Sequence, residues 1–144
     1  MKKVARSAIV EHSAAEMYAL VEDIEAYPGF LPWCLAAVVH ERRAGTTRAT
    51  LTAGLAGLQQ SFTTLNENRP GEAIDLRLVE GPFRHFGAQW RFVPLSPQAC
   101  RIEFSLQYEF SSRALGRLLA PLFDGIADSM VDAFVRRAAQ VYEG

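Results

Sequence analysis

The chain has 144 residues, of which 49% are hydrophobic and 22% are charged, so it has the size and composition of one globular domain with a sizeable core. Its formal net charge of -1 excludes a global positive field that would draw it onto nucleic acid or anionic lipid. We therefore expect a single domain over residues 1–144, in which binding of either partner would require a local patch.

Export and membrane insertion are not expected from the N-terminal half. Lys2 and Lys3 resemble the start of a signal peptide, but Arg6 and Glu11 interrupt the sequence before an apolar region forms. The uncharged run 26–39 is too short to cross a bilayer and contains two prolines.

Cysteine and histidine usage predicts no metal or cofactor. Cys34 and Cys100 lack any CxxC or Cys/His spacing and are expected to be small buried hydrophobic residues. The three histidines are scattered without a carboxylate at metal-ligand spacing, and no glycine-rich phosphate loop is present.

The first elements are a strand and two short helices. Residues 3–11 alternate between two faces, which predicts a strand. Ser13 and Glu16 form an S-x-x-E capping box, which predicts that a helix begins there. A second short helical turn is expected through Ile24.

The next segment, YPGFLPWC at 27–34, concentrates apolar side chains where two prolines prevent an ordinary helix or central strand. Phe30, Leu31 and Trp33 must therefore be covered, either as a hydrophobic plug or as the wall of a site for an apolar small molecule. If they are exposed beside a cavity mouth, they would also anchor the chain on a membrane surface.

A long strand-like region follows, and its short turns predict an antiparallel meander. Turn chemistry occurs at 44–45, 54–57, 66–71, 81–82 and 96–98. The last two strands direct aromatic rows to one side: Phe86, Ala88, Trp90 and Phe92, then Ile102, Phe104, Leu106, Tyr108 and Phe110.

From Ser112 the apolar period becomes helical and continues to Tyr142, which predicts a long C-terminal helix. Pro121 predicts a kink or a break near residues 116–121. A curved sheet with this helix across its apolar face leaves space for a ligand wherever side chains do not fill it. Alternation alone leaves a cavity and a solid core equally open.

Three segments in this order carry a family resemblance: YPGFLPWC, LVEGPFRHFGAQWRFVPL at 78–95 and FDGIADSMVDAFVRRAAQVY at 123–142. Over essentially its whole length the chain resembles the coenzyme Q-binding family of START-like proteins in the polyketide cyclase (SRPBCC) superfamily, which also contains bacterial ribosome-association toxins of the RatA type. The resemblance implies an α+β helix-grip fold, in which a curved antiparallel sheet of about six to seven strands wraps around a long C-terminal helix. Two short helices lie between the first two strands.

The resemblance also implies a hydrophobic tunnel and non-catalytic binding of ubiquinone, or another polyprenyl lipid, in support of respiration. A quinone needs an apolar slot and hydrogen-bond donors for its carbonyl oxygens. The donor candidates are Arg84, Trp90 and Tyr108. Core packing of the apolar residues, and a solvated turn position for Arg84, are the structural alternatives. The expected walls are Phe30, Leu31, Trp33, Phe62, Trp90, Phe92, Phe104, Tyr108, Phe123, Met130 and Phe134.

The alternative that the family implies is a toxin that binds the large ribosomal subunit, blocks subunit association and inhibits translation. Binding of ribosomal RNA would use clustered cations, although short charge runs also form ordinary solvated faces. Both functions imply the bacterial cytoplasm, at the periphery of the inner membrane for a lipid carrier. The available clusters are Lys2 with Lys3, Arg42 with Arg43 and Arg48, and Arg136 with Arg137.

An enzyme is not expected, although some helix-grip relatives are cyclases or aromatases. Such chemistry would need an acid/base pair inside the cavity, whereas the inward positions of the strands are almost wholly apolar. Aspartates recur every four residues, at Asp124, Asp128 and Asp132, and this spacing is typical of the solvent-facing side of a helix.

Overall fold

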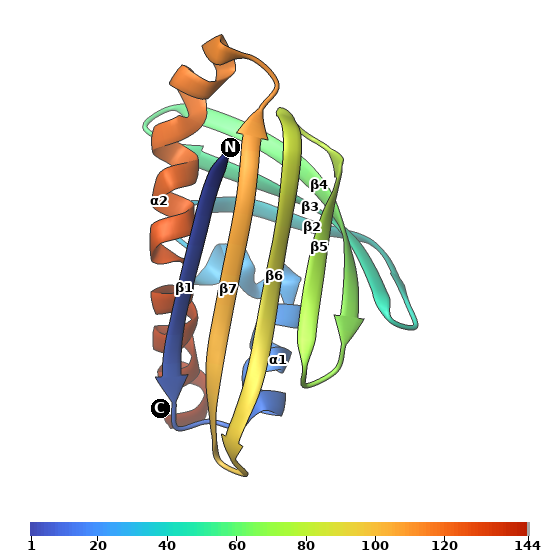
Figure 1. The fold of residues 1–144 in the computed structure, drawn as a ribbon, viewed down its shortest axis with the longest axis vertical. Coiled ribbons are helices and arrows are strands. Elements are labelled where there is room, and N and C mark those ends of the chain that lie inside the picture. The colour runs from blue at the N-terminus through green and yellow to red at the C-terminus, as the bar shows by residue number, and fades with distance from the viewer. Residues whose placement is uncertain (144) are drawn as a thin grey trace.

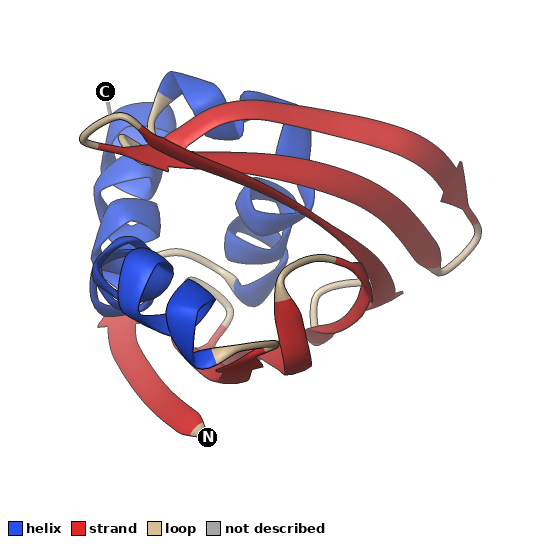
Figure 2. Ribbon diagram, turned by 90° about the horizontal axis from the view of Figure 1, so that it is seen from above, coloured by secondary structure: helices blue, strands red, loops and turns tan. Residues whose placement is uncertain are grey.

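The structure, a computed structural model, describes residues 1–143. Seven antiparallel strands form one sheet in the order β1-β7-β6-β5-β4-β3-β2, and the helices lie on its concave side (Figures 1 and 2). The predicted helix-grip architecture is confirmed. The elements are β1 (Lys2–Val10), α1 (Ala14–Glu22), the 3₁₀ helix η1 (Ile24–Gly29), β2 (Cys34–Arg43), β3 (Thr46–Leu55), β4 (Leu58–Arg69), β5 (Ala73–Glu80), β6 (Phe83–Ser96), β7 (Ala99–Phe110), α2 (Arg113–Ala138) and the π-helical turn η2 (Ala139–Glu143).

The predicted capping box opens α1. The Ser13 hydroxyl accepts a hydrogen bond from the Glu16 backbone N–H at 3.1 Å, and the Glu16 carboxylate accepts one from the Ser13 N–H at 2.9 Å. Two of the N–H groups that a helix start leaves unpaired are thereby satisfied. Met17, Leu20 and Val21 then turn their side chains into the core.

One predicted turn is displaced. The segment 66–71 was expected to be irregular because of its polar residues, but β4 continues to Arg69. Asn66 is buried in register with Thr47 and Leu76, and its side-chain oxygen accepts a hydrogen bond from the Thr64 hydroxyl at 2.8 Å. A satisfied polar side chain can remain inside a sheet, so the chain turns only afterwards.

Of the kink or break expected near residues 116–121, the break is wrong, because α2 runs as one helix from Arg113 to Ala138. The Ser112 hydroxyl caps its first turn by accepting from the Leu115 N–H at 3.2 Å. Pro121 lies on the exposed side, while the opposite side of α2 is buried from Leu119 to Ala138. Burial of that side offsets the hydrogen bond that proline removes, which is worth about 3 kcal/mol together with its steric cost.

Two groups of aromatic rings fill the interior between the sheet and α2. In the Phe83 cluster, the Phe83 ring contacts its neighbours at centroid distances from 5.1 to 6.2 Å; these are Phe62, Phe86, Tyr108, Phe110 and Phe123. In the Phe134 cluster, the Phe134 ring lies 5.2 to 5.5 Å from Tyr27, Phe30 and Trp90. No ring contact among residues 1–143 joins a member of one cluster to a member of the other.

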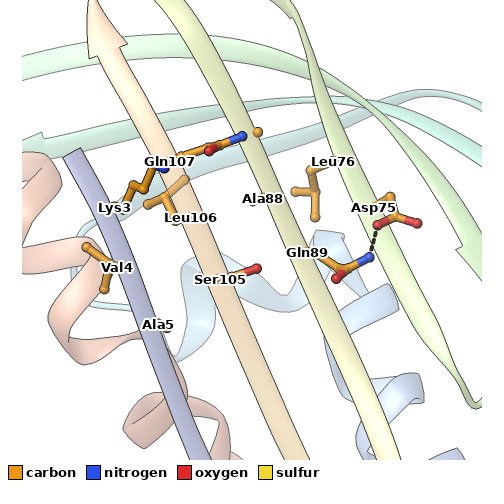
Figure 3. Close-up of a pocket in the computed structure, with 11 residues that line it drawn as sticks. Lys3, Val4, Ala5, Asp75, Leu76, Ala88, Gln89, Ser105, Leu106 and Gln107 are labelled. Carbon is orange, nitrogen blue, oxygen red and sulfur yellow. Dashed lines mark hydrogen bonds between the residues drawn. The ribbon is translucent and has the colours of Figure 1, made fainter. Parts of the chain in front are cut away.

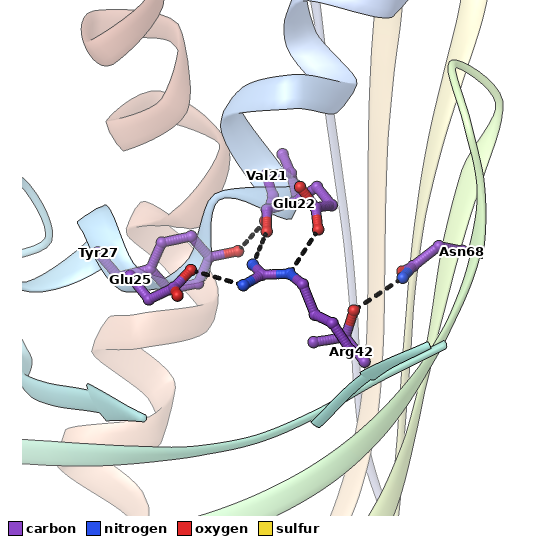
Figure 4. A network of polar contacts seen from close by, with 7 residues as sticks. Val21, Glu22, Glu25, Tyr27, Arg42 and Asn68 are labelled. Atoms are coloured by element: carbon purple, nitrogen blue, oxygen red, sulfur yellow. Dashed lines mark hydrogen bonds and ion pairs between the residues drawn. The ribbon is translucent and has the colours of Figure 1, made fainter. Parts of the chain in front are cut away.

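The edge strand β2 is tied to the first helices by one arginine (Figure 4). The Arg42 guanidinium donates from Nε to the Glu22 carboxylate at 3.1 Å and from Nη1 to the Glu25 carboxylate at 2.8 Å. It also donates from Nη2 to the Glu22 backbone carbonyl at 3.2 Å. Partial burial is the largest single effect on the pKa of Arg42 and lowers it, but the hydrogen bonds and charges of Glu25 and Glu22 together outweigh burial and raise the pKa above its ordinary value.

Replacement of Arg42 by alanine should lower the free energy of unfolding by about 1 kcal/mol, because the lost network is partly exposed and screened by solvent. Urea denaturation measures this change. Arg43→Ala is the matched control, since within residues 1–143 Arg43 pairs only with Glu41 on the same strand, at 2.7 Å. Equal losses in the two variants would contradict a linking role for Arg42.

Candidate functional site

The corner between η1 and β2 turns its side chains inward. Leu31 is 1% exposed and Trp33 is 8% exposed, so the expectation that they project beside a cavity mouth as membrane anchors is wrong. The backbone N–H of Leu31 donates to the Tyr27 carbonyl at 2.9 Å, which pulls this part of the corner toward the core. Phe30 is half-buried against Phe134, and the Arg137 guanidinium lies 4.9 Å from its ring centroid.

The structure places the remaining candidate walls in the packed interior. Met130 is half-buried against the same core, and Phe62, Trp90, Phe92, Phe104, Tyr108, Phe123 and Phe134 are buried. Arg84, a candidate donor, is instead exposed on the outside, where its Nη2 lies 3.5 Å from the Ser111 carbonyl and its Nη1 lies 3.9 Å from Glu109. Arg84 therefore does not face the interior.

Tyr108, another candidate donor, already has a partner. Its hydroxyl donates to the Asp124 carboxylate at 2.6 Å, and Lys2 Nζ lies 3.7 Å from the same oxygen. Sequence periodicity assigned Asp124 to the solvent-facing side of α2 and missed this pair. The available signal was that a buried tyrosine hydroxyl needs a partner, and that Asp124 follows a buried Phe123 on the facing helix.

Tyr108→Phe should lower the free energy of unfolding at pH 7 by about 1.5 kcal/mol, because a hydrogen bond to a charged group is lost. Burial is the main cause that raises the pKa of Tyr108 above its ordinary value, and the hydrogen bond to Asp124 raises it further. The hydroxyl's contribution is therefore complete below about pH 10 and is lost as the pH rises through the folded-state pKa. Urea denaturation from pH 7 to 11 should show the difference between wild type and variant shrinking above pH 10; a constant difference would contradict the assignment.

A groove of about 220 Å³ runs between the corner, the end of β3 and α2. Trp33 is the only candidate wall residue that lines it. We call it the α2 groove. Its lining consists of Pro32, Trp33, Gly54, Leu55, Leu122, Gly125, Ile126, Ser129, Ala133 and Arg136.

Trp33, which lines this groove, also carries a buried unsatisfied group. Its indole Nε1 is buried and has no hydrogen-bond partner within residues 1–143, where no other buried side-chain nitrogen or oxygen is in this state. Leaving a buried donor unpaired costs about 1–3 kcal/mol.

A larger hollow, about 570 Å³, lies on the face of the sheet that the helices leave uncovered (Figure 3). It exists because the outward positions of three adjacent strands carry the small residues Ala5, Gly87 and Ser105. Gln89 and Gln107 flank them with amide groups. The hollow is open, and its lining combines the charged side chains of Lys3 and Asp75 and the two amides with a larger apolar part, as macromolecular contact surfaces do.

A second hollow of about 330 Å³ shares Ala5, Gln89 and Ser105 with the first and extends it to Arg91. We call the two together the outward trough. Lys3 lines one end and Arg91 the other, and neither has a carboxylate oxygen within 4 Å among the described residues.

Two of the five arginines predicted to form basic clusters are already paired. Arg42 and Arg43 pair with carboxylates, and Lys2 lies beside Asp124. Arg48 and Arg136 are exposed and have no carboxylate oxygen within 4 Å in the described part of the chain. The 42–43–48 cluster therefore offers one free cation in place of three.

Cys34 and Cys100 are free and buried, as expected. Burial raises the pKa of the Cys34 thiol to about 11 and also raises the pKa of Cys100, so both are poor nucleophiles at neutral pH. Within residues 1–143, no helix is long and apolar enough to cross a membrane.

Solved structures share this fold. The Zhui aromatase/cyclase from Streptomyces sp. R1128 superposes with a TM-score of 0.84 at 16% identity, covering 99% of this chain and 98% of that one. A START superfamily protein from Mycobacterium smegmatis gives 0.80 at 23% identity, covering 96% and 98%. These likenesses show that the chain has the START-like, helix-grip fold.

Sequence comparison then gives the family. The model described as "Polyketide cyclase / dehydrase and lipid transport" matches residues 10–135, and the chain belongs to this family. The ribosome association toxin RatA of Vibrio cholerae is 42% identical over 142 residues, which cover 99% of each chain. The mitochondrial coenzyme Q-binding protein COQ10 homolog B of Xenopus laevis is 31% identical over 140 residues, covering 94% of this chain and 57% of that protein.

Proposed function

We propose that this protein binds the large ribosomal subunit, blocks subunit association and thereby inhibits translation in the bacterial cytoplasm. The observation that carries the proposal is the similarity to a ribosome association toxin at 42% identity over 99% of both chains. The similarity to a coenzyme Q-binding protein is lower, at 31%, and leaves much of that relative uncovered. The proposal requires no catalytic residue.

The outward trough supports this function as the contact surface. It lies on the uncovered sheet face, offers the Gln107 amide, and has the cations Lys3 and Arg91 at its ends. The Gln89 amide is already used, because it donates to Asp75 and accepts from Arg91 Nε at 2.8 Å, and the carboxylates of Asp75 and Glu103 also line the trough. Unpaired Lys and Arg side chains provide the electrostatic part of binding to RNA, while the Gln107 amide can form hydrogen bonds with backbone oxygens. The overall charge of -1 makes such a local surface necessary.

Expression of the protein in bacterial cells should lower the fraction of joined ribosomes in sucrose gradients and increase the free subunits. The double variant Lys3→Glu, Arg91→Glu should restore much of the joined fraction, because both changes place a negative charge at the trough. Arg43→Glu, a charge reversal away from the trough, is the matched control and should remain inhibitory. An unchanged profile with the wild-type protein would overturn the proposal.

Binding of ubiquinone or another polyprenyl quinone is the second candidate function. The α2 groove and the COQ10 relative favour it. The groove's 220 Å³ lies below the usual range of about 300–1,000 Å³ for ligand pockets, so it would accept part of such a molecule. Organic extraction of the purified protein, with a thermal melt in added quinone, tests this function; no extracted quinone and no shift would remove it.

A further inference from the structure

One end of the molecule gathers arginines around the start of α2. The beginning of β6, the end of β7 and the first turn of α2 lie together there (Figure 1). Arg84 Nη2 lies 3.5 Å from the carbonyl of Ser111, which precedes the α2 cap by one residue, so Arg84 is close to Arg113. Arg117 follows about one helical turn later. We call Arg84, Arg113 and Arg117 together the basic end.

The two helical arginines of the basic end stand where α2 disfavours positive charge. Arg113 is the first residue of the helix, whose N-terminal end is partly positive, and the first turn contains no acidic residue. Arg117 lies four residues further on the same side, and like charges at this spacing repel each other. Both are exposed and have no carboxylate oxygen within 4 Å among residues 1–143. These charges oppose the stability of α2, as residues that serve a partner often do.

Negative charge does not cancel the basic end. The Glu109 carboxylate lies 3.9 Å from Arg84 Nη1 and 3.9 Å from His85 Nε2, and such long, exposed ion pairs are weak. Glu80, across the turn that leads into β6, lines a separate hollow with Arg48. Positive charge therefore prevails around the start of α2.

The basic end is continuous with the outward trough. His85 pairs with Glu109 across β6 and β7, and the next pair along these strands, Gly87 with Gln107, lines the trough. One extended partner can therefore contact both surfaces. A guanidinium binds phosphate through forked, charge-assisted hydrogen bonds, and the phosphates of a nucleic acid strand supply a regular row of such groups.

We infer that the basic end binds the phosphate backbone of RNA in the large ribosomal subunit, with Arg84, Arg113 and Arg117 as the contacting side chains. The inference rests on the proposed function and adds to it the kind of partner and a second contact surface beside the trough. It also separates binding from stability, because the same arginines that bind RNA oppose the start of α2.

Co-sedimentation with purified large subunits tests the arginines. The double variant Arg113→Glu, Arg117→Glu should weaken binding about tenfold or more, while its melting temperature should rise by about 2 °C because acidic residues favour a helix start. Loss of folding therefore cannot explain the loss of binding. The double variant Arg43→Glu, Arg48→Glu, with the same change of charge near the β2–β3 turn, is the matched control and should bind within about threefold of wild type.

Radical cleavage from a tethered iron chelate tests the kind of partner. Cys34 and Cys100 are buried, so the exposed thiol introduced by Ala114→Cys takes the chelate selectively. Hydroxyl radicals released there should cut the RNA of the bound large subunit. The same chelate at Gln98→Cys, in the turn at the opposite end of β6 and β7, is the control and should cut much less.

The outcomes distinguish this inference from the proposed function. Wild-type protein that sediments with the subunit, together with equal binding by Arg113→Glu, Arg117→Glu, would overturn the inference alone. Binding without RNA cleavage from position 114 would assign the contact to an acidic ribosomal protein and overturn the RNA partner. Wild-type protein that does not sediment with the large subunit would overturn both.

Discussion

Replacement of Phe134 by alanine should lower the free energy of unfolding by about 3–5 kcal/mol, the usual range for deletion of a fully buried ring. Phe134 is 0% exposed, and its ring lies edge-on against Tyr27, Phe30 and Trp90. Phe134, on α2, therefore packs the η1 corner (Tyr27 and Phe30) against the sheet (Trp90) in the middle of the core. Alanine would remove all three ring contacts and leave a cavity that rigid neighbours close only in part.

Urea denaturation with a constant m value would measure the loss. Phe134→Leu is the control, because a smaller apolar side chain retains much of the volume and should cost about 1–2 kcal/mol. A loss below about 1 kcal/mol in the alanine variant would mean that the interior is not packed around this ring.

Phe83→Ala should be almost as destabilising, by about 3–5 kcal/mol. Phe83 contacts five other rings at the opposite end of the interior, including Phe62 and Phe123. It shares no ring contact with Phe134, so the two losses should add. The double variant would then lose about 6–10 kcal/mol, comparable with the whole stability of a typical domain, and should be largely unfolded at 25 °C.

Circular dichroism of the two single variants and the double variant tests this prediction. A double variant that unfolds no more easily than Phe134→Ala would contradict two independent clusters and indicate one coupled interior.

Aromatic side chains fill the interior between the sheet and α2, and this affects where a ligand or partner would bind. The sequence left a cavity and a solid core equally open, and the aromatic rows of β6 and β7 pack against α2 in the Phe83 and Phe134 clusters. The two spaces used in the proposals lie elsewhere, on the uncovered sheet face and beside α2. In both proposals, binding therefore takes place at the surface of the molecule.

Most of the architecture could be predicted from local patterns. Alternation in 99–110 marked a half-buried strand, and the Ser13 capping box marked the start of α1. The failures at Asn66 and Pro121 share a cause, because tertiary packing stabilised residues whose local preferences oppose a strand or a helix.

The site was less predictable because it depends on side-chain direction. Composition showed that Leu31 and Trp33 must be covered, but only the backbone hydrogen bonds of the corner turn them inward. The Tyr108–Asp124 bond joins residues 16 positions apart on a strand and a helix, and periodicity on either element alone does not reveal it. The unpaired Trp33 N–H likewise becomes visible only once the neighbouring groups have been placed.

The most direct test of the proposed function is joining of purified ribosomal subunits in the presence of this protein. Large and small subunits are mixed in magnesium, with the protein in excess, and association is followed by light scattering and then by sucrose-gradient sedimentation. Our proposal predicts that joining is suppressed and that the protein sediments with the large subunit alone. Complete joining, with the protein remaining at the top of the gradient, would contradict it.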